Sequence, residues 1–107
     1  MEKFKPHYSL EHIKALLGDA KTRTITRLSR QGAVALGYMD DEDMVSIVAR
    51  LSQKHFYKSM TTLQSSRIWQ DVYKIVDEDK RLYLKVQLSP DHKSAVIVQF
   101  KRDEGGD

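Results

Sequence analysis

The hydrophobic residues of this 107-residue chain change their spacing once, near residue 54, and this change constrains the fold more than any other feature. Before it, apolar side chains recur every three or four residues, as on a helix with one buried face. After it they alternate, as on a β-strand. The order predicts an α+β fold in which the helices come first and pack on one face of a sheet that follows.

Three helices are predicted in the first half of the chain: residues 9–17, residues 24–36 and a third that begins at Asp40. Ser9 is a suitable N-cap for the first helix, and Gly18 a suitable end. In the second helix, Gly32 is unfavourable by about 1 kcal/mol relative to alanine. In the third, an apolar face repeats at helical spacing. Its residues are Met44, Ile47, Val48 and Leu51.

Four strands are predicted in the second half, at residues 55–62, 68–75, 81–88 and 95–101. These segments are rich in β-branched and aromatic residues, which favour strands. The connections between them are short, and short connections join antiparallel neighbours. We therefore expect an antiparallel sheet of about four strands, with residues 1–107 forming a single domain.

Alternation along the last three strands assigns each side chain to one face of the expected sheet. The side chains expected to face the core are Trp69, Tyr73, Ile75, Leu82, Leu84, Val86, Leu88, Val96, Val98 and Phe100. The side chains expected on the opposite, open face are Gln70, Lys74, Arg81, Tyr83, Lys85, Gln87, Ala95, Ile97, Gln99 and Lys101.

The first strand is harder to orient, because Lys58 shares its side with Phe56 and Met60 while Tyr57 falls on the other. An unpaired lysine ammonium is costly to bury, which favours placing Lys58 on the open face. That face then collects Lys58, Gln70, Tyr83, Lys85 and Lys101. One wet face is ordinary for an antiparallel sheet, so a solvated surface without a function is the alternative.

Charge is unevenly distributed along the chain. Ten of the 15 acidic residues lie in three clusters, at residues 40–43, at residues 77–79 and in the tail at Asp103, Glu104 and Asp107. The rest of the chain carries 18 basic and five acidic residues, which suits a polyanion such as nucleic acid. A basic surface with no partner is the alternative. Residues 40–43 indicate a helix start and not a metal site, because consecutive carboxylates point in different directions around a helix.

Several kinds of site are excluded by composition. Without cysteine there is no disulfide, thiolate zinc site or cysteine nucleophile. The histidines show no metal-ligand spacing and are read as ordinary polar residues; they are His7, His12, His55 and His92. No apolar run is long enough to span a bilayer, and the N-terminus lacks the apolar segment of a secretory signal. We expect a cytoplasmic protein with no cofactor and no membrane association.

One reaction suits the open face without a metal, namely internal cleavage of RNA. The ribose 2′-hydroxyl can attack the adjacent phosphate while the protein removes its proton, stabilises the phosphate charge and protonates the departing 5′-oxygen. Lysines can stabilise the charge, and a tyrosine or lysine with a lowered pKa can transfer protons. Gln70 can only hydrogen-bond a phosphate or a base edge. A non-catalytic RNA-binding module would carry a similar face.

Four strings carry a resemblance to a known family: FYKSMTT, IWQDVYK, LYLKVQL and VIVQFK. With the start MEKFKPHYSL and the segment ALGYMDDEDMVSIVARLS, they resemble the MqsR family of bacterial toxin ribonucleases over nearly the whole chain. The resemblance implies a RelE-like fold. It also implies the toxin of a type II toxin–antitoxin system, a metal-independent endoribonuclease that cuts mRNA at GCU-like sites and causes growth arrest.

The resemblance also implies partners. One is the mRNA substrate, and the other is a cognate antitoxin with a zinc-binding N-terminal domain and a DNA-binding C-terminal domain. Operator DNA would be reached only through the antitoxin. The alternatives are a non-catalytic RNA- or ribosome-binding module with a decayed site, and a pure protein-interaction domain.

Site residues can be carried over where the strings match. The family's catalytic residues match Lys58, Gln70, Tyr83 and Lys101. Which of Lys58 and Tyr83 is the general base and which the general acid stays open, because coupled groups share a titration.

Three further residues are expected to bind substrate, namely Tyr57, Met60 and Lys85. Tyr57 conflicts with simple alternation, which places it opposite Lys58, so contact with RNA would need an edge position or a bulge. The acidic turn at residues 77–79 and the acidic tail depart from the family, and we expect them to affect RNA affinity and cleavage preference.

Overall fold

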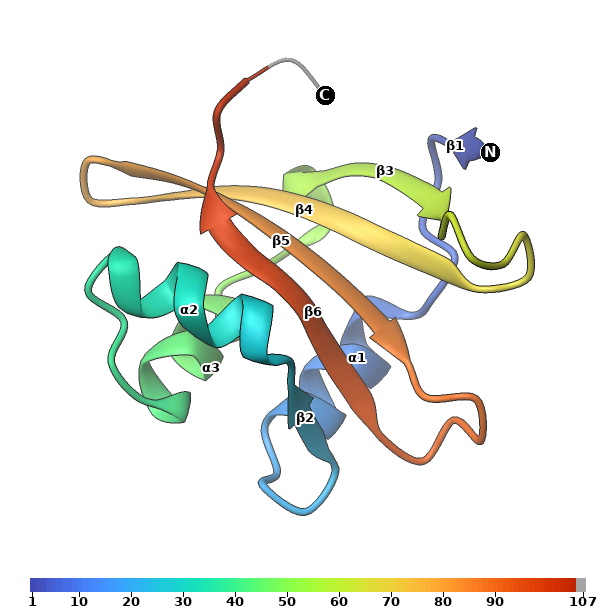
Figure 1. The fold of residues 1–107 in the computed structure, drawn as a ribbon, viewed down its shortest axis with the longest axis horizontal. Coiled ribbons are helices and arrows are strands. Elements are labelled where there is room, and N and C mark those ends of the chain that lie inside the picture. The colour runs from blue at the N-terminus through green and yellow to red at the C-terminus, as the bar shows by residue number, and fades with distance from the viewer. Residues whose placement is uncertain (106–107) are drawn as a thin grey trace.

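The computed structural model describes residues 1–105, so Asp107 of the acidic tail lies outside the described residues. Within that range six strands form one sheet in the order β1-β3-β4-β5-β6-β2, and three helices cover one face of it (Figure 1). The strands are β1 (Glu2–Lys3), β2 (Arg23–Ile25), β3 (Phe56–Thr61), β4 (Trp69–Asp77), β5 (Lys80–Leu88) and β6 (Ala95–Arg102). The helices are α1 (Leu10–Leu17), α2 (Arg27–Ala35) and α3 (Asp41–Ala49), followed by the 3-10 helix η1 (Gln53–His55). The predicted α+β fold is confirmed.

Each α-helix begins at a side chain that caps it. The hydroxyl of Ser9 accepts from the His12 amide, and the Asp40 carboxylate accepts from the Asp43 amide, as the sequence predicted. The second helix begins later than predicted, with Thr26 as its cap. The reason is that residues 23–25 form β2 instead. Among residues 1–105 there is no helix with the length and hydrophobicity of a transmembrane span.

Two short strands, β1 and β2, were not predicted. They have two and three residues, too few for alternation to be recognised. β1 pairs antiparallel with β3, and β2 pairs parallel with β6, so the sheet is mixed. The four strands β3 to β6 form the predicted antiparallel meander at its centre.

The hydrophobic core lies between the helices and the sheet. The helical segment supplies Leu10, Ile13, Leu17, Ala33, Tyr38, Met44, Ile47, Val48 and Leu51. The sheet supplies Tyr73, Ile75, Leu82, Leu84, Val86, Leu88, Ala95, Ile97 and Phe100. The core face predicted for β5 is therefore confirmed in full.

A β-bulge interrupts β6. Lys85 of β5 pairs with Gln99, but the next residue, Val86, pairs with Ile97, which leaves Val98 without a cross-strand partner. An extra residue in one strand reverses the alternation of every side chain on one side of it. The bulge therefore changes which residues of β6 face the core.

The faces predicted for the first half of β6 are wrong for this reason. Ala95 and Ile97, expected on the open face, are fully buried in the core. Val96 and Val98, expected in the core, are only partly buried. After the bulge, Phe100 lies in the core as predicted.

A second bulge lies at the start of β3. Phe56 pairs with Tyr73, whereas Lys58 pairs with Val72, so Tyr57 is the extra residue. Phe56 therefore turns toward the core, where its ring lies edge-on to Tyr73 with centroids 5.6 Å apart. Lys58 turns to the opposite face, although alternation had placed both residues on one side.

The predicted core position of Trp69 is wrong. Its ring is partly exposed and stacks on His7, with the centroids 5.4 Å apart. His7 is held there by Asp71, a buried β4 carboxylate that accepts from the amides of His7 and Tyr8 at 3.0–3.1 Å. Asp71 thus fixes the N-terminal segment along the sheet, and no feature of the sequence pointed to this function.

Gly32 allows α2 to approach β6 closely. A Cβ atom at this position would lie 2.0 Å from the carbonyl oxygen of Phe100, much closer than van der Waals contact. The glycine that weakens the helix in isolation is therefore required by packing. The contact lies beside Lys101, so it also positions the backbone that carries a predicted site residue.

Candidate active site

The face of the sheet opposite the helices carries aligned rows of side chains from β3, β4, β5 and β6. The first row is Lys74, Tyr83 and Lys101. The second row is Lys58, Val72, Lys85 and Gln99. Directly opposed residues in such rows have Cβ atoms about 4.5–5.5 Å apart, so their side chains are neighbours. The bulge in β3 allows Lys58 to lie on this face while Phe56 faces the core, and Lys101 lies on it as alternation predicted.

Tyr83 is the centre of the first row, and its residue is only 5% exposed. The ammonium of Lys101 lies 5.0 Å from the centre of its ring, and that of Lys85 lies 6.0 Å away. Positive charge near a phenol stabilises the negative charge that forms when the phenol gives up its proton. The expectation that Tyr83 is open to solvent is wrong, because the residue is almost fully buried although it lies on the open face.

Lys58 is also nearly buried, contrary to the expected exposed position. Its ammonium lies 2.6 Å from Oε2 of Glu2, in the added strand β1. Glu2 is opposite Met60 in the β1–β3 ladder, which places its carboxylate next to the lysine. Burial of the amine is tolerated because the charge is paired.

Tyr57 lies beside the lysines although alternation had placed it on the other face. As the extra residue of the β3 bulge, it follows neither face of the strand. Its ring centre lies 3.8 Å from the ammonium of Lys74 and 5.6 Å from that of Lys58. The predicted conflict between Tyr57 and Lys58 is therefore resolved by the bulge, and the tyrosine ring forms one border of the site.

Gln70 and Met60 are directly opposed in the β3–β4 ladder. The side-chain amide of Gln70 donates from Nε2 to Oε1 of Gln87 at 2.8 Å. This bond orients the Gln70 amide, which lies on the same face two residues along β4 from Val72 of the second row. Every residue predicted for the site therefore lies on or beside this one face.

Carboxylates from the C-terminal segment approach the first row. Asp103 lies 3.3 Å from the ammonium of Lys74, and Glu104 lies 3.9 Å from that of Lys101. Together with Glu2, these acids place negative charge where a bound anion would compete with them. The acidic tail was noticed in the sequence, but Glu2 carried no signal because its strand was not predicted.

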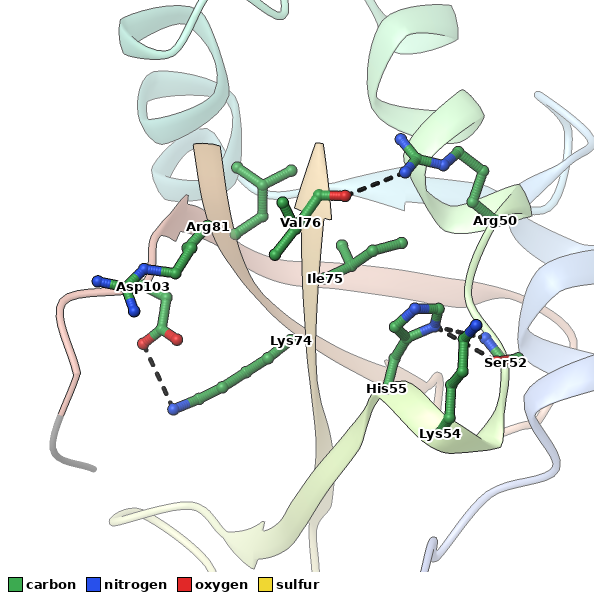
Figure 2. Close-up of a pocket in the computed structure, with 10 residues that line it drawn as sticks. Arg50, Ser52, Lys54, His55, Lys74, Ile75, Val76, Arg81 and Asp103 are labelled. Atoms are coloured by element: carbon green, nitrogen blue, oxygen red, sulfur yellow. Dashed lines mark hydrogen bonds and ion pairs between the residues drawn. The ribbon is translucent and has the colours of Figure 1, made fainter. Parts of the chain in front are cut away.

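The first row continues into a pocket of about 670 Å³ at the free edge of β4 (Figure 2). Lys74 borders both the row and the pocket. His55 lines the pocket, and burial, followed by the charges of Lys54 and Arg50, lowers its pKa from the ordinary value. Within residues 1–105, no group of three or more His, Cys, Asp or Glu side chains could hold a metal ion.

The fold and this face define a class, that of small α+β proteins with a basic, tyrosine-bearing surface on one side of a sheet. Comparison with known proteins is more specific. The family model described as "Motility quorum-sensing regulator, toxin of MqsA" matches residues 5–102. The mRNA interferase toxin MqsR of Escherichia coli (strain K12) is 40% identical over 101 residues, which are 94% of this chain and 98% of that protein. The chain therefore belongs to the MqsR toxin family, and the resemblance noted in the sequence is confirmed.

Proposed function

We propose that this protein is the toxin of a type II toxin–antitoxin system and acts as an endoribonuclease on mRNA. The observation that carries the proposal is the gathering of Lys58, Tyr83 and Lys101 on one face, although three different strands supply them. Membership of the MqsR toxin family supports the proposal, as does the relative named as an mRNA interferase.

In this mechanism the 2′-oxygen of the substrate forms a bond to the adjacent phosphorus, and the bond from phosphorus to the 5′-oxygen breaks. The products are a 2′,3′-cyclic phosphate and a 5′-hydroxyl. Lys101 stabilises the charge on the phosphate, since a fixed cation acts most strongly where charge develops. The protein itself supplies the proton transfers, and no metal step is needed.

Lys58 and Tyr83 are the two groups assigned to proton transfer. One takes the proton of the 2′-hydroxyl and the other gives a proton to the departing 5′-oxygen. Gln70, oriented by Gln87, hydrogen-bonds the phosphate or a base edge. Tyr57 and Met60 contact the bases on either side of the lysines, and Lys85 contributes to substrate binding.

The resemblance to the family supports a substrate preference and partners for this proposal. Cleavage is expected at GCU-like sites in mRNA. The partner is an antitoxin like MqsA, which the description of the family names. In this proposal the antitoxin carries the zinc-binding and DNA-binding domains, operator DNA is contacted only through it, and the toxin acts in the cytoplasm.

The proposal is tested with a defined transcript that contains one GCU site, incubated with purified protein in EDTA with and without ribosomes. Mapping the new ends should show a 2′,3′-cyclic phosphate at that site. Tyr83→Phe and Lys101→Met should cleave far more slowly while still binding the transcript. Binding without any cleaved ends would favour the alternative of a non-catalytic RNA- or ribosome-binding module.

A further inference from the structure

The pocket at the free edge of β4 has a strongly basic lining. Four cationic side chains and one carboxylate border it: Arg50, Lys54, Lys74, Arg81 and Asp103. Figure 2 shows Lys74, Arg81 and Asp103 on one side of β4, and Arg50, Lys54 and His55 on the other. β3 pairs with β4 only as far as Tyr73, so within residues 1–105 the edge of β4 beyond that residue has no strand beside it. The pocket therefore presents positive charge around a part of β4 that pairs with no described strand on this side.

The cations of the pocket differ in how they are held. Arg50 donates to Oδ1 of Asp77 at 2.7 Å and to the carbonyl of Val76 at 3.0 Å, so its position is fixed. Lys54 and Arg81 are exposed on opposite sides of the opening. Counting Asp77 as well as Asp103, cations still outnumber carboxylates. The field in the pocket consequently favours an anion.

His55 adds a neutral hydrogen-bond donor. Its Nδ1 accepts from the Ser52 amide at 3.0 Å, which leaves the hydrogen of the neutral ring on Nε2. Burial, followed by the charges of Lys54 and Arg50, lowers its pKa, which favours the neutral ring. A neutral donor among arginine and lysine side chains suits an oxygen-rich anion, for which both charge and hydrogen bonds count.

The pocket is continuous with the candidate active site through Lys74. The ammonium of Lys74 lies 3.8 Å from the centre of the Tyr57 ring, and its strand position is opposite Tyr83. An RNA strand with its reacting phosphate beside Tyr83 would bring its next phosphates past Lys74. Each nucleotide carries one negative charge, and single-stranded RNA is bound through grooves that track its backbone with cations.

We propose that this pocket binds the backbone phosphates of the nucleotides that flank the cleaved bond, so that single-stranded RNA crosses the free edge of β4. The inference rests on the proposed endoribonuclease function and extends it to a second contact with the same substrate. Lys54, Arg81 and His55 form this flanking-phosphate subsite, and Lys74 links it to the reacting phosphate.

The test uses RNA oligonucleotides around one GCU site, each with a single uncharged methylphosphonate linkage at a different position. A second set carries a 2′-deoxy residue at the cleaved bond, so that binding is measured without cleavage. The protein is compared with the double variant Lys54→Ala/Arg81→Ala. The control is Lys21→Ala/Arg27→Ala, which removes the same charge from exposed positions outside the pocket lining.

For the unmodified protein, an uncharged linkage at certain flanking positions should weaken binding of the 2′-deoxy RNA about tenfold. The pocket variant should lose about the same affinity for fully charged RNA. An uncharged linkage at those positions should then weaken its binding no further, because the pocket cations and the flanking phosphates are partners in one interaction. Its slope of log affinity against log salt should fall by about 1.4, or about 0.7 for each lost phosphate contact. In cleavage, KM should rise and kcat should not change.

The inference is overturned if the pocket variant and the control lose equal affinity, or if the variant keeps the full penalty of the uncharged linkages. It is also overturned if RNA binding is unchanged while binding of the antitoxin weakens, because the pocket would then be a protein interface. If the unmodified protein cleaves no all-ribose substrate, the proposed endoribonuclease function is wrong. The binding of 2′-deoxy RNA still decides the subsite in that case.

Discussion

The ammonium of Lys58 and the carboxylate of Glu2 form an ion pair of 2.6 Å between residues 56 positions apart in the sequence. The lysine side chain is 4% exposed, and the glutamate side chain is 46% exposed. A carboxylate and a phosphodiester are both oxyanions, so Glu2 lies where a substrate phosphate would pair with Lys58. Substrate binding would therefore require that the lysine exchange one partner for another.

Replacing Glu2 by glutamine removes this competing charge. We expect Glu2→Gln to lower the KM for RNA about threefold to tenfold with little change in kcat, because the phosphate no longer displaces a carboxylate. The melting temperature should fall, since the amine loses its charged partner. Steady-state cleavage and thermal unfolding measure the two effects. The control is Glu11→Gln, which changes an exposed glutamate of α1. A raised KM in Glu2→Gln would show that Glu2 instead positions Lys58 for the reaction.

Tyr83→Phe removes one hydroxyl and keeps the ring that Lys101 and Lys85 surround. We expect kcat to fall about 10²- to 10⁴-fold, the usual contribution of a general acid or base. The KM should change little. Single-turnover cleavage measures the loss. Tyr38→Phe is the matched control, because the Tyr38 hydroxyl donates to Asp77, outside the rows of the open face. Equal losses of kcat in both variants would argue against a chemical function for Tyr83.

Tyr57 is expected to stack on a base of the substrate. Tyr57→Ala should raise the KM by about 5- to 150-fold, the equivalent of one lost base–aromatic contact of about 1–3 kcal/mol. Tyr57→Phe keeps the ring and should retain most of the affinity. Binding of RNA that carries an abasic residue at each position would identify the stacked base. A similar loss in both variants would indicate that the hydroxyl, and not the ring, contacts RNA.

Gly32→Ala should destabilise the fold even though alanine favours helices. The added Cβ would lie 2.0 Å from the carbonyl oxygen of Phe100, so α2 must move away from β6. We expect a loss of about 1–3 kcal/mol in the free energy of unfolding, as for other overpacked sites. Urea denaturation measures it, and Gln31→Ala on the exposed side of α2 is the control. Cleavage should also slow, because the displaced backbone continues into Lys101.

Asp77 should make stability depend on pH in the acid range. The hydrogen bond from Tyr38, followed by the one from Arg50, lowers the pKa of this carboxyl in the folded protein. A lowered folded pKa means that the stabilisation is complete above the unfolded value of about 4 and is lost as pH falls through the folded value. Asp77→Asn should cost about 1–3 kcal/mol at pH 7 and progressively less below pH 4. Urea denaturation of both proteins from pH 7 to pH 2.5 tests this, and a constant difference would contradict it.

The parts of the fold that could be predicted from the sequence depend on local chemistry. Ser9 and Asp40 cap helices because their side chains accept backbone hydrogen bonds, and this preference is visible in any sequence. The alternating leucines of β5 identify its core face, so Tyr83 and Lys85 were placed correctly. These signals need no knowledge of how distant segments pair.

The parts that could not be predicted depend on distant pairing. The bulge at Val98 places both Ala95 and Ile97 on the core face instead of the open face. A run of aliphatic residues gives no sign of where an extra residue lies. The burial of Lys58 required Glu2, which reaches it only because β1 joins the sheet edge. The sequence therefore identified which residues belong to the candidate site, but not how deeply they are buried or which groups they pair with.

The bulge at Tyr57 has a consequence for variation among relatives of this protein. Loops at the surface can gain or lose residues without moving the rest of the chain, whereas Tyr57 is the one extra residue in a paired strand, and its deletion would leave Phe56 and Lys58 adjacent and still on opposite faces. The ladder could then pair without a bulge, and the ring beside the ammonium groups of Lys74 and Lys58 would be lost. A relative that lacks this residue should consequently keep both the sheet and the position of the lysine, and lose only the base contact that we propose for the ring.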